Sequence, residues 1–138
     1  MLKQRLLHPE ILDALAAAGH GAKVLITDAN YPASTKLGEN AALVYLNLAP
    51  GKLTATEVLD ALLTAIPIED AAVMEPASGP EPTIFSEFSR LLPDLELSRY
   101  DRFEFYEVAS SPDTCLQIVT GEQRIYANLL LTIGVVAP

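Results

Sequence analysis

Residues 129–136, near the end of the chain, limit the possible folds more than any other segment. They read Leu-Leu-Leu-Thr-Ile-Gly-Val-Val and are almost wholly apolar. A strand that lacks alternating polar residues must be buried on both of its faces. The residues that bury these faces belong either to this subunit, in a sheet with helices on both sides, or to a neighbouring subunit in an oligomer.

A helix followed directly by a strand occupies residues 9–28. The apolar residues of HPEILDALAAAGHG recur at helical spacing, with Pro9 in the first turn and Gly19 as the stop. The next run, KVLITDA, predicts a buried strand that ends near Asp28. A helix and a strand joined by a tight glycine turn indicate an α/β layer fold, in which ligands bind at the ends of strands.

The rest of the chain continues the alternation of strands and helices. Strands are predicted at residues 42–49, 70–76, 115–121 and 125–136, and helices at residues 54–66, 84–92 and 98–110. Thr54 and Glu57 form a capping box, and the last helix is expected to begin near Ser98 with Asp101 as its capping partner. We therefore predict one domain over residues 1–138, a three-layer α/β/α sandwich with a mostly parallel or mixed central sheet.

The composition argues against several classes of partner. A net charge of -9 and nine scattered Lys and Arg residues disfavour nucleic acid. No apolar run approaches the ~20 residues of a membrane span, and the N-terminus lacks the apolar centre of a secretory signal, so we expect a cytoplasmic protein with no membrane partner. One cysteine and two histidines cannot assemble a usual zinc site. No phosphate or dinucleotide motif is present, so we expect neither metal nor cofactor.

His20 and Asp28 flank the strand predicted at residues 23–27. A histidine of ordinary pKa, about 6.5, transfers protons near neutral pH, although His20 could simply cap the preceding helix. Asp28 could likewise only organise the next turn. An extended segment between the two residues would span roughly 26 Å, too far for one small substrate. Either the glycine-rich segment folds back, or the two residues come from different subunits.

Polar residues in the C-terminal half are further candidates. Arg102 lies in a first helical turn, where the helix dipole disfavours a cation, so it serves either a ligand or an ion pair. Tyr106 lies on the same helix face as Arg102. It is either a half-buried aromatic residue or a group that carries a proton. Tyr126 and Asn128 are two apart in a predicted strand, and their neutral donors and acceptors suit hydroxyl groups. Glu122 is interpreted as a turn residue.

Three segments together resemble the family of ribose pyranases and fucose mutarotases. They are GHG…TDANYPA, RFEFYE and TGE…YANLLLTIGVV, which keep their order at both ends of the chain, whereas residues 33–98 match less well. The resemblance implies an isomerase that interconverts the cyclic forms of a free monosaccharide without a cofactor. It also implies a ring-shaped homo-oligomer, an octamer or decamer, with sites between neighbouring subunits.

The same resemblance implies roles for individual residues. His20 corresponds to the proton donor. Because the resemblance implies that His20 and Asp28 reach the same sugar, we favour the folded-back arrangement of the glycine-rich segment. The residues that correspond to ligands of the sugar are Asp28, Arg102, Tyr126 and Asn128. Ring opening needs a second proton transfer, for which Asp28 and Tyr106 are the candidates.

The choice of sugar stays open between L-fucose and D-ribose. Arg102 within RFEFYE is similar to the fucose branch, but Asn30 stands where that branch has a histidine, in Asp-Ala-His-Phe-Pro. The competing hypothesis is a non-catalytic sugar-binding protein, or a regulatory protein associated with transport. An anion- or nucleotide-binding domain built on Arg102 is disfavoured by the acidic charge and the missing phosphate loop.

Overall fold

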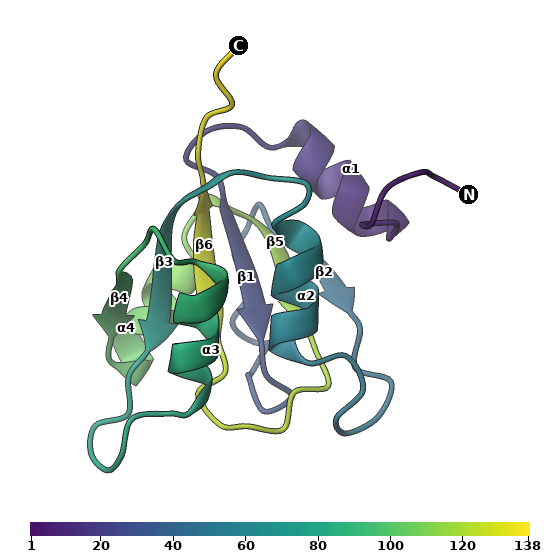
Figure 1. The fold of residues 1–138 in the computed structure, drawn as a ribbon. Helices are drawn as coiled ribbons and strands as arrows, with labels where there is room; N and C mark the ends of the chain where they lie inside the picture. Colours follow the sequence, from purple (N-terminus) through teal and green to yellow (C-terminus); the bar gives the residue numbers. More distant parts are fainter.

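A computed structural model describes residues 1–138 as a six-stranded sheet with four helices (Figure 1). The helices are α1 (Pro9–Ala17), α2 (Ala55–Leu62), α3 (Ile84–Leu91) and α4 (Arg102–Ala109). The strands are β1 (Lys23–Thr27), β2 (Ala42–Tyr45), β3 (Ile68–Met74), β4 (Leu97–Tyr100), β5 (Thr114–Val119) and β6 (Leu129–Ile133). Their order in the sheet is β2-β5-β1-β6-β3-β4. None of the helices is both long enough and apolar enough to cross a membrane.

Helices cover both faces of the sheet, which confirms the predicted α/β/α sandwich with a mixed sheet. In Figure 1, α2 and α3 lie in front of the sheet and α4 lies behind it, while α1 packs near β2 and β5. Successive residues of β1 alternate between two apolar clusters: Val24 and Ile26 face the larger one and Leu25 the smaller. This period of two is what a strand buried on both sides requires.

Strand β6 is central and buried within the subunit. Leu129 and Leu131 belong to the larger cluster and Leu130 to the smaller, so the prediction of burial on both faces is confirmed for this part of the segment. Val135 and Val136 are not buried within the subunit, since their exposed fractions are 64% and 79%, so for them only cover by a neighbouring subunit stays open. These residues follow the last sheet pairing and belong to the C-terminal segment that leaves the body of the molecule (Figure 1).

The predicted helix start near Ser98 is wrong. Residues Leu97–Tyr100 form the edge strand β4, paired in parallel with β3, and the helix begins only at Arg102. Asp101 is its N-cap, because the Asp101 carboxylate accepts hydrogen bonds from the backbone N–H groups of Phe103 and Glu104. Pairing with β3 therefore prevails over the helical pattern in the residues before Asp101.

The strand directions bring the carboxyl ends of five strands to the same end of the sheet. β6 is antiparallel to β1 and β3, whereas the pairs β1–β5, β2–β5 and β3–β4 are parallel. The carboxyl ends of β1 to β5 and the start of β6 therefore meet at the same edge. This carboxyl edge, at the bottom in Figure 1, is where an open α/β sheet usually binds its ligand.

Candidate active site

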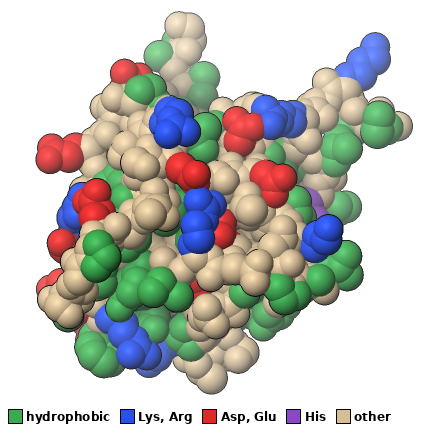
Figure 2. Space-filling view, turned by 60° about the horizontal axis from the view of Figure 1, so that its bottom comes forward, with side chains coloured by type: hydrophobic (Ala, Val, Ile, Leu, Met, Phe, Trp, Pro, Cys, Tyr) green, Lys and Arg blue, Asp and Glu red, His purple; other side chains and the backbone are tan.

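A cavity of about 200 Å³ opens at the carboxyl edge. Five of the six residues predicted from the sequence line it: Asp28, Arg102, Tyr106, Tyr126 and Asn128. Figure 2 turns this edge toward the reader, and hydrophobic side chains gather along the lower part of that view with Lys and Arg side chains beside them at lower left. This volume is below the roughly 300 to 1,000 Å³ of pockets for drug-sized ligands, so the cavity is suited to a smaller molecule.

Asp28 joins the two chain segments that form the floor of the cavity. One carboxylate oxygen accepts hydrogen bonds from the Ala127 backbone N–H and the Asn128 amide, both at 3.2 Å. The other accepts from the Asn30 backbone N–H at 2.9 Å, and the Asp28 N–H donates to Asn128 Oδ1 at 3.0 Å. Burial raises the pKa of Asp28, and these hydrogen bonds oppose the rise. Asp28 therefore fixes Asn128 in addition to facing the cavity.

Arg102 and Tyr106 form the exposed wall of the cavity. Arg102 Nε donates to the Tyr106 hydroxyl at 3.1 Å, and the guanidinium lies 5.6 Å from the centre of the Tyr106 ring. The ion pairs of the structure do not include Arg102, so the interpretation of Arg102 as an ion-pair residue is wrong. The remaining N–H groups of the guanidinium are available to a ligand.

Tyr126 and Asn128 share the cavity, but not through a strand. β6 begins at Leu129, and Tyr126 has a φ of 60°, in the left-handed region. The expectation of an extended backbone at these two residues is wrong, because the chain turns here between the Asp28 hydrogen bonds and the start of β6. Their polar groups nevertheless line the same cavity.

His20 lies at the opposite edge of the sheet, before β1. Its Nε2 is 2.8 Å from a carboxylate oxygen of Glu69, and its side chain is 59% exposed. The next residue, Gly21, donates its N–H to Ile133 at the far end of β6, at 2.9 Å. The favoured arrangement, in which this segment folds back toward Asp28, is therefore wrong. Within one subunit the structure does not bring His20 to the cavity.

Four further lining residues were not singled out in the sequence: Asn30, Tyr31, Met74 and Ile125. Met74 and Ile125 give no polar signal, and Asn30 and Tyr31 fall in a loop where composition indicates only a turn. Tyr31 is 7% exposed, and its ring packs edge-on against Tyr106 at 5.4 Å. Its hydroxyl is buried without a hydrogen-bond partner. Burial raises the pKa of Tyr31, so the hydroxyl keeps its proton.

Replacing Tyr31 by phenylalanine is expected to raise the free energy of unfolding by about 1 kcal/mol, because it removes a buried hydroxyl that has no partner. Urea unfolding measures the change. Tyr45→Phe is the matched control, since the Tyr45 side chain is exposed on β2 and its stability should not change. A loss of stability in Tyr31→Phe, with the control unchanged, would contradict the expectation.

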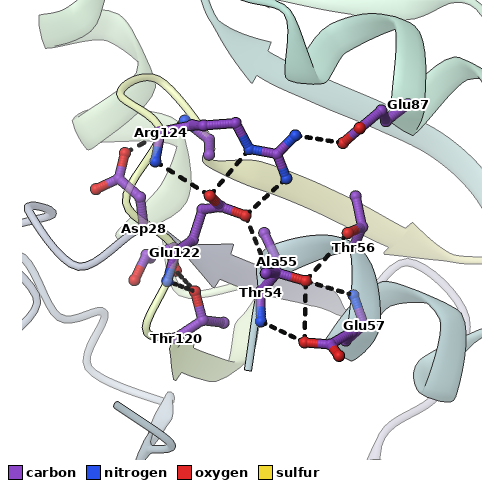
Figure 3. A network of polar contacts seen from close by, with 11 residues as sticks. Asp28, Thr54, Ala55, Thr56, Glu57, Glu87, Thr120, Glu122 and Arg124 are labelled. Carbon is purple, nitrogen blue, oxygen red and sulfur yellow. Dashed lines mark hydrogen bonds and ion pairs between the residues drawn. The ribbon is translucent and has the colours of Figure 1, made fainter. Parts of the chain in front are cut away.

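A cluster of charges around the buried Glu122 lies beside the cavity (Figure 3). Glu122 is 3% exposed, and its carboxylate accepts hydrogen bonds from Arg124 Nε at 3.0 Å and Arg124 Nη2 at 2.9 Å. It also accepts one from the Ala55 N–H, at the start of α2. Arg124 Nη1 donates to Glu87 of α3 at 2.5 Å. The interpretation of Glu122 as a mere turn residue is therefore wrong.

The cluster also makes stability depend on pH. Burial by itself would raise the pKa of Glu122, but the hydrogen bonds and charge of Arg124 together lower it below the usual carboxyl range. A carboxyl whose pKa is lower in the folded state stabilises the fold above its unfolded pKa, and this contribution is lost as the pH falls through the folded pKa.

The variant Glu122→Gln is accordingly expected to be less stable than the wild type by about 1 to 3 kcal/mol at neutral pH. The difference should shrink as the pH falls below the ordinary glutamate pKa of about 4.3 and through the lower pKa of folded Glu122. Urea unfolding from pH 7 to about pH 3 measures it, and the other carboxyls, Asp28 included, are common to both proteins. A difference that stays constant with pH would show that the charge of Glu122 is not responsible.

No group of three or more His, Cys, Asp or Glu side chains is placed to hold a metal ion. The polar groups of the cavity are instead one carboxylate, one guanidinium, amides and phenol hydroxyls. Together they offer both donors and acceptors, which is the set that binds the hydroxyl groups of a neutral ligand.

Comparison with known proteins agrees with this chemistry. A fucose mutarotase from Homo sapiens is 33% identical over an alignment of 148 positions, gaps included, which covers 96% of this chain and 91% of that protein. A D-ribose pyranase 2 from Streptomyces griseus is 31% identical over 135 residues and covers 98% of both chains. The crystal structure of the fucose mutarotase from Streptococcus pneumoniae in complex with L-fucose superposes with a TM-score of 0.82, at 25% identity, over 99% of this chain and all of that one.

The match extends beyond single relatives to the model of a whole family. That model, described as the RbsD / FucU transport protein family, matches residues 1–136. It therefore also includes residues 33–98, which resemble the family motifs less closely. The chain belongs to the RbsD / FucU family, as the resemblance in its sequence implied.

Proposed function

We propose that residues 1–138 form one mutarotase or pyranase unit, an isomerase that interconverts the cyclic forms of a free monosaccharide such as L-fucose or D-ribose. The observation that carries the proposal is the cavity at the carboxyl edge, where Asp28, Arg102, Tyr126 and Asn128 present donors and acceptors together. Relatives named for this activity on fucose and on ribose support it.

The chemistry needs only proton transfers. A cyclic hemiacetal opens when one group protonates the ring oxygen and another removes the proton of the anomeric hydroxyl. We assign the first role to His20, and the second to Asp28 or Tyr106. The raised pKa of Asp28 makes its carboxylate a stronger base than an exposed aspartate. The reaction requires no cofactor, and the free Cys115 fits a reducing compartment such as the cytoplasm.

A neighbouring subunit supplies His20 in this proposal. Its own subunit holds His20 at the far edge of the sheet, next to the exposed apolar tail that contains Val135 and Val136. The carboxyl edge presents exposed Phe103 and Ile125 around the cavity. A head-to-tail contact would bury both apolar surfaces and bring His20 to the next subunit's cavity. Repetition of such a contact closes into a ring, for which we propose eight or ten subunits.

Saturation-transfer NMR tests the activity. L-Fucose, D-ribose and D-galactose are each mixed with a small amount of protein, and magnetisation transfer between their cyclic forms is measured. The proposal expects faster exchange for at least one sugar. The alternative is a non-catalytic sugar-binding protein. Such a protein would shift the sugar resonances but would not speed the exchange. A monomer at micromolar concentration, by sedimentation, would contradict the shared site.

A further inference from the structure

Tyr126 has a backbone conformation that the surrounding residues must impose. Its φ of 60° lies in the left-handed region, which is unfavourable for a residue with a large side chain. Such conformations persist only where neighbouring contacts leave the chain no alternative, and they concentrate at functional sites. The contacts that hold this turn therefore bear on the sugar cavity that Tyr126 lines.

Tyr126 also has free space on two sides. It lines the sugar cavity of about 200 Å³, and it lines a second cavity of about 510 Å³ beneath the proline-rich loop 76–83. Packing alone thus does not confine the side chain to the first cavity. The position of the backbone at residue 126 has to determine which cavity receives the phenol ring.

The chain is held on both sides of Tyr126. On the C-terminal side, the Asp28 carboxylate accepts hydrogen bonds from the Ala127 N–H and the Asn128 amide. On the N-terminal side, Arg124 is held by two carboxylates. Glu122 binds its Nε and Nη2, and Glu87 of α3 binds its Nη1 (Figure 3).

The two carboxylates engage three of the five N–H groups of the Arg124 guanidinium. Nε, Nη1 and Nη2 all donate to Glu122 or Glu87, and these hydrogen bonds and charges raise the pKa of Arg124 further above its usual value. The Arg124 backbone N–H donates to Glu122 as well, at 3.0 Å. Arg124 is thereby fixed through both its main chain and its side chain, two residues before Tyr126.

We propose that Glu87, Arg124 and Glu122 form a positioning unit that keeps Tyr126 in the sugar cavity. The inference rests on the proposed function, because it concerns how that site holds its substrate. Glu87 is the residue that joins the unit to helix α3, and it does not line the sugar cavity. When its contact is lost, Tyr126 spends part of its time in the second cavity. Sugar affinity then falls in proportion to the fraction of competent sites.

The test compares two replacements of Glu87 in the assembled protein. Glu87→Ala is expected to raise KM for the active sugar about tenfold, the loss of one hydrogen bond to a hydroxyl, with kcat changed less than about twofold. Glu87→Gln keeps an oxygen that accepts from Arg124 Nη1, and it should restore KM to within about threefold of the wild type. Asp60→Ala is the control, since it removes an exposed ion pair to Arg5 and should leave both constants unchanged.

A double-mutant cycle separates positioning from general loss of stability. Tyr126→Phe removes the hydroxyl that the unit positions, so adding Glu87→Ala to Tyr126→Phe should weaken sugar binding by less than about twofold. Losses that multiply, or an unchanged KM in Glu87→Ala, would overturn the inference and leave the proposed function standing. A wild-type protein that binds none of L-fucose, D-ribose and D-galactose would overturn both.

Discussion

Replacing His20 by alanine is expected to slow the interconversion of a bound sugar by about 10²- to 10⁴-fold, the usual contribution of one positioned acid or base. Sugar affinity should change far less, because the residues that line the cavity stay in place. Saturation transfer measures the exchange rate, and titration of the sugar resonances measures the affinity. Replacement of the other histidine, His8→Ala, is the control, since His8 caps α1 through a hydrogen bond from Ile11. An unchanged exchange rate in His20→Ala would show that His20 is not the acid.

Mixed oligomers test whether the site is shared between subunits. His20→Ala subunits retain the cavity, and Asp28→Asn subunits retain His20. When the two variants are coexpressed in equal amounts in a head-to-tail ring, they should recover about a quarter of the wild-type activity. In that fraction of contacts, an intact cavity from one subunit meets an intact His20 from the next. If one subunit supplied both residues, every site would carry a substitution and no activity would return.

Gly121→Ala is expected to destabilise the protein by about 3 kcal/mol or more. A Cβ at this position would lie 2.1 Å from the Lys52 carbonyl oxygen and 2.7 Å from the Ala49 carbonyl oxygen. Both obstacles are backbone, and Gly121 is also tied to that loop by a hydrogen bond to Leu53 at 3.0 Å, so neither segment can withdraw cheaply. Urea unfolding measures the loss.

The control for this change is Gly19→Ala, where a Cβ would meet nothing within 4 Å. Its stability should stay within about 1 kcal/mol of the wild type. Similar stabilities for the two variants would contradict the close approach at Gly121. Because Glu122 follows Gly121 directly, we also expect weaker sugar binding in whatever Gly121→Ala protein remains folded.

The parts of the fold that the sequence predicts are those with a strong local pattern. The apolar run of β6, the capping box at Thr54 and the helix that ends before Gly19 each carry their own signal. β4 has no such signal, because its four residues are an edge strand only through pairing with β3. Val135 continues the apolar pattern but has no strand beside it, since the pairing of β6 ends at Ile133.

The candidate site divides in the same way. Asp28 could be found because it follows a predicted strand, and polar residues at the ends of strands converge at one edge of the sheet. Tyr126 and Asn128 were found through their spacing and the family motif, although the chain turns where a strand was expected. The ion pair of Glu87 with Arg124 spans 37 positions, and no periodicity indicates which of many charged residues will meet. The location of His20 relative to the cavity depends on contacts between subunits, which the pattern of a single chain does not specify.

The reversed strand β6 has a consequence for how the protein is made. It is the last strand to leave the ribosome, yet it is the only link between the block β2-β5-β1 and the pair β3-β4. Until β6 has been synthesised, both blocks present an unpaired apolar edge to their surroundings. We expect nascent chains to depend on chaperones. Deletion of the last ten residues, which removes all of β6, should leave two parts of a sheet that do not join.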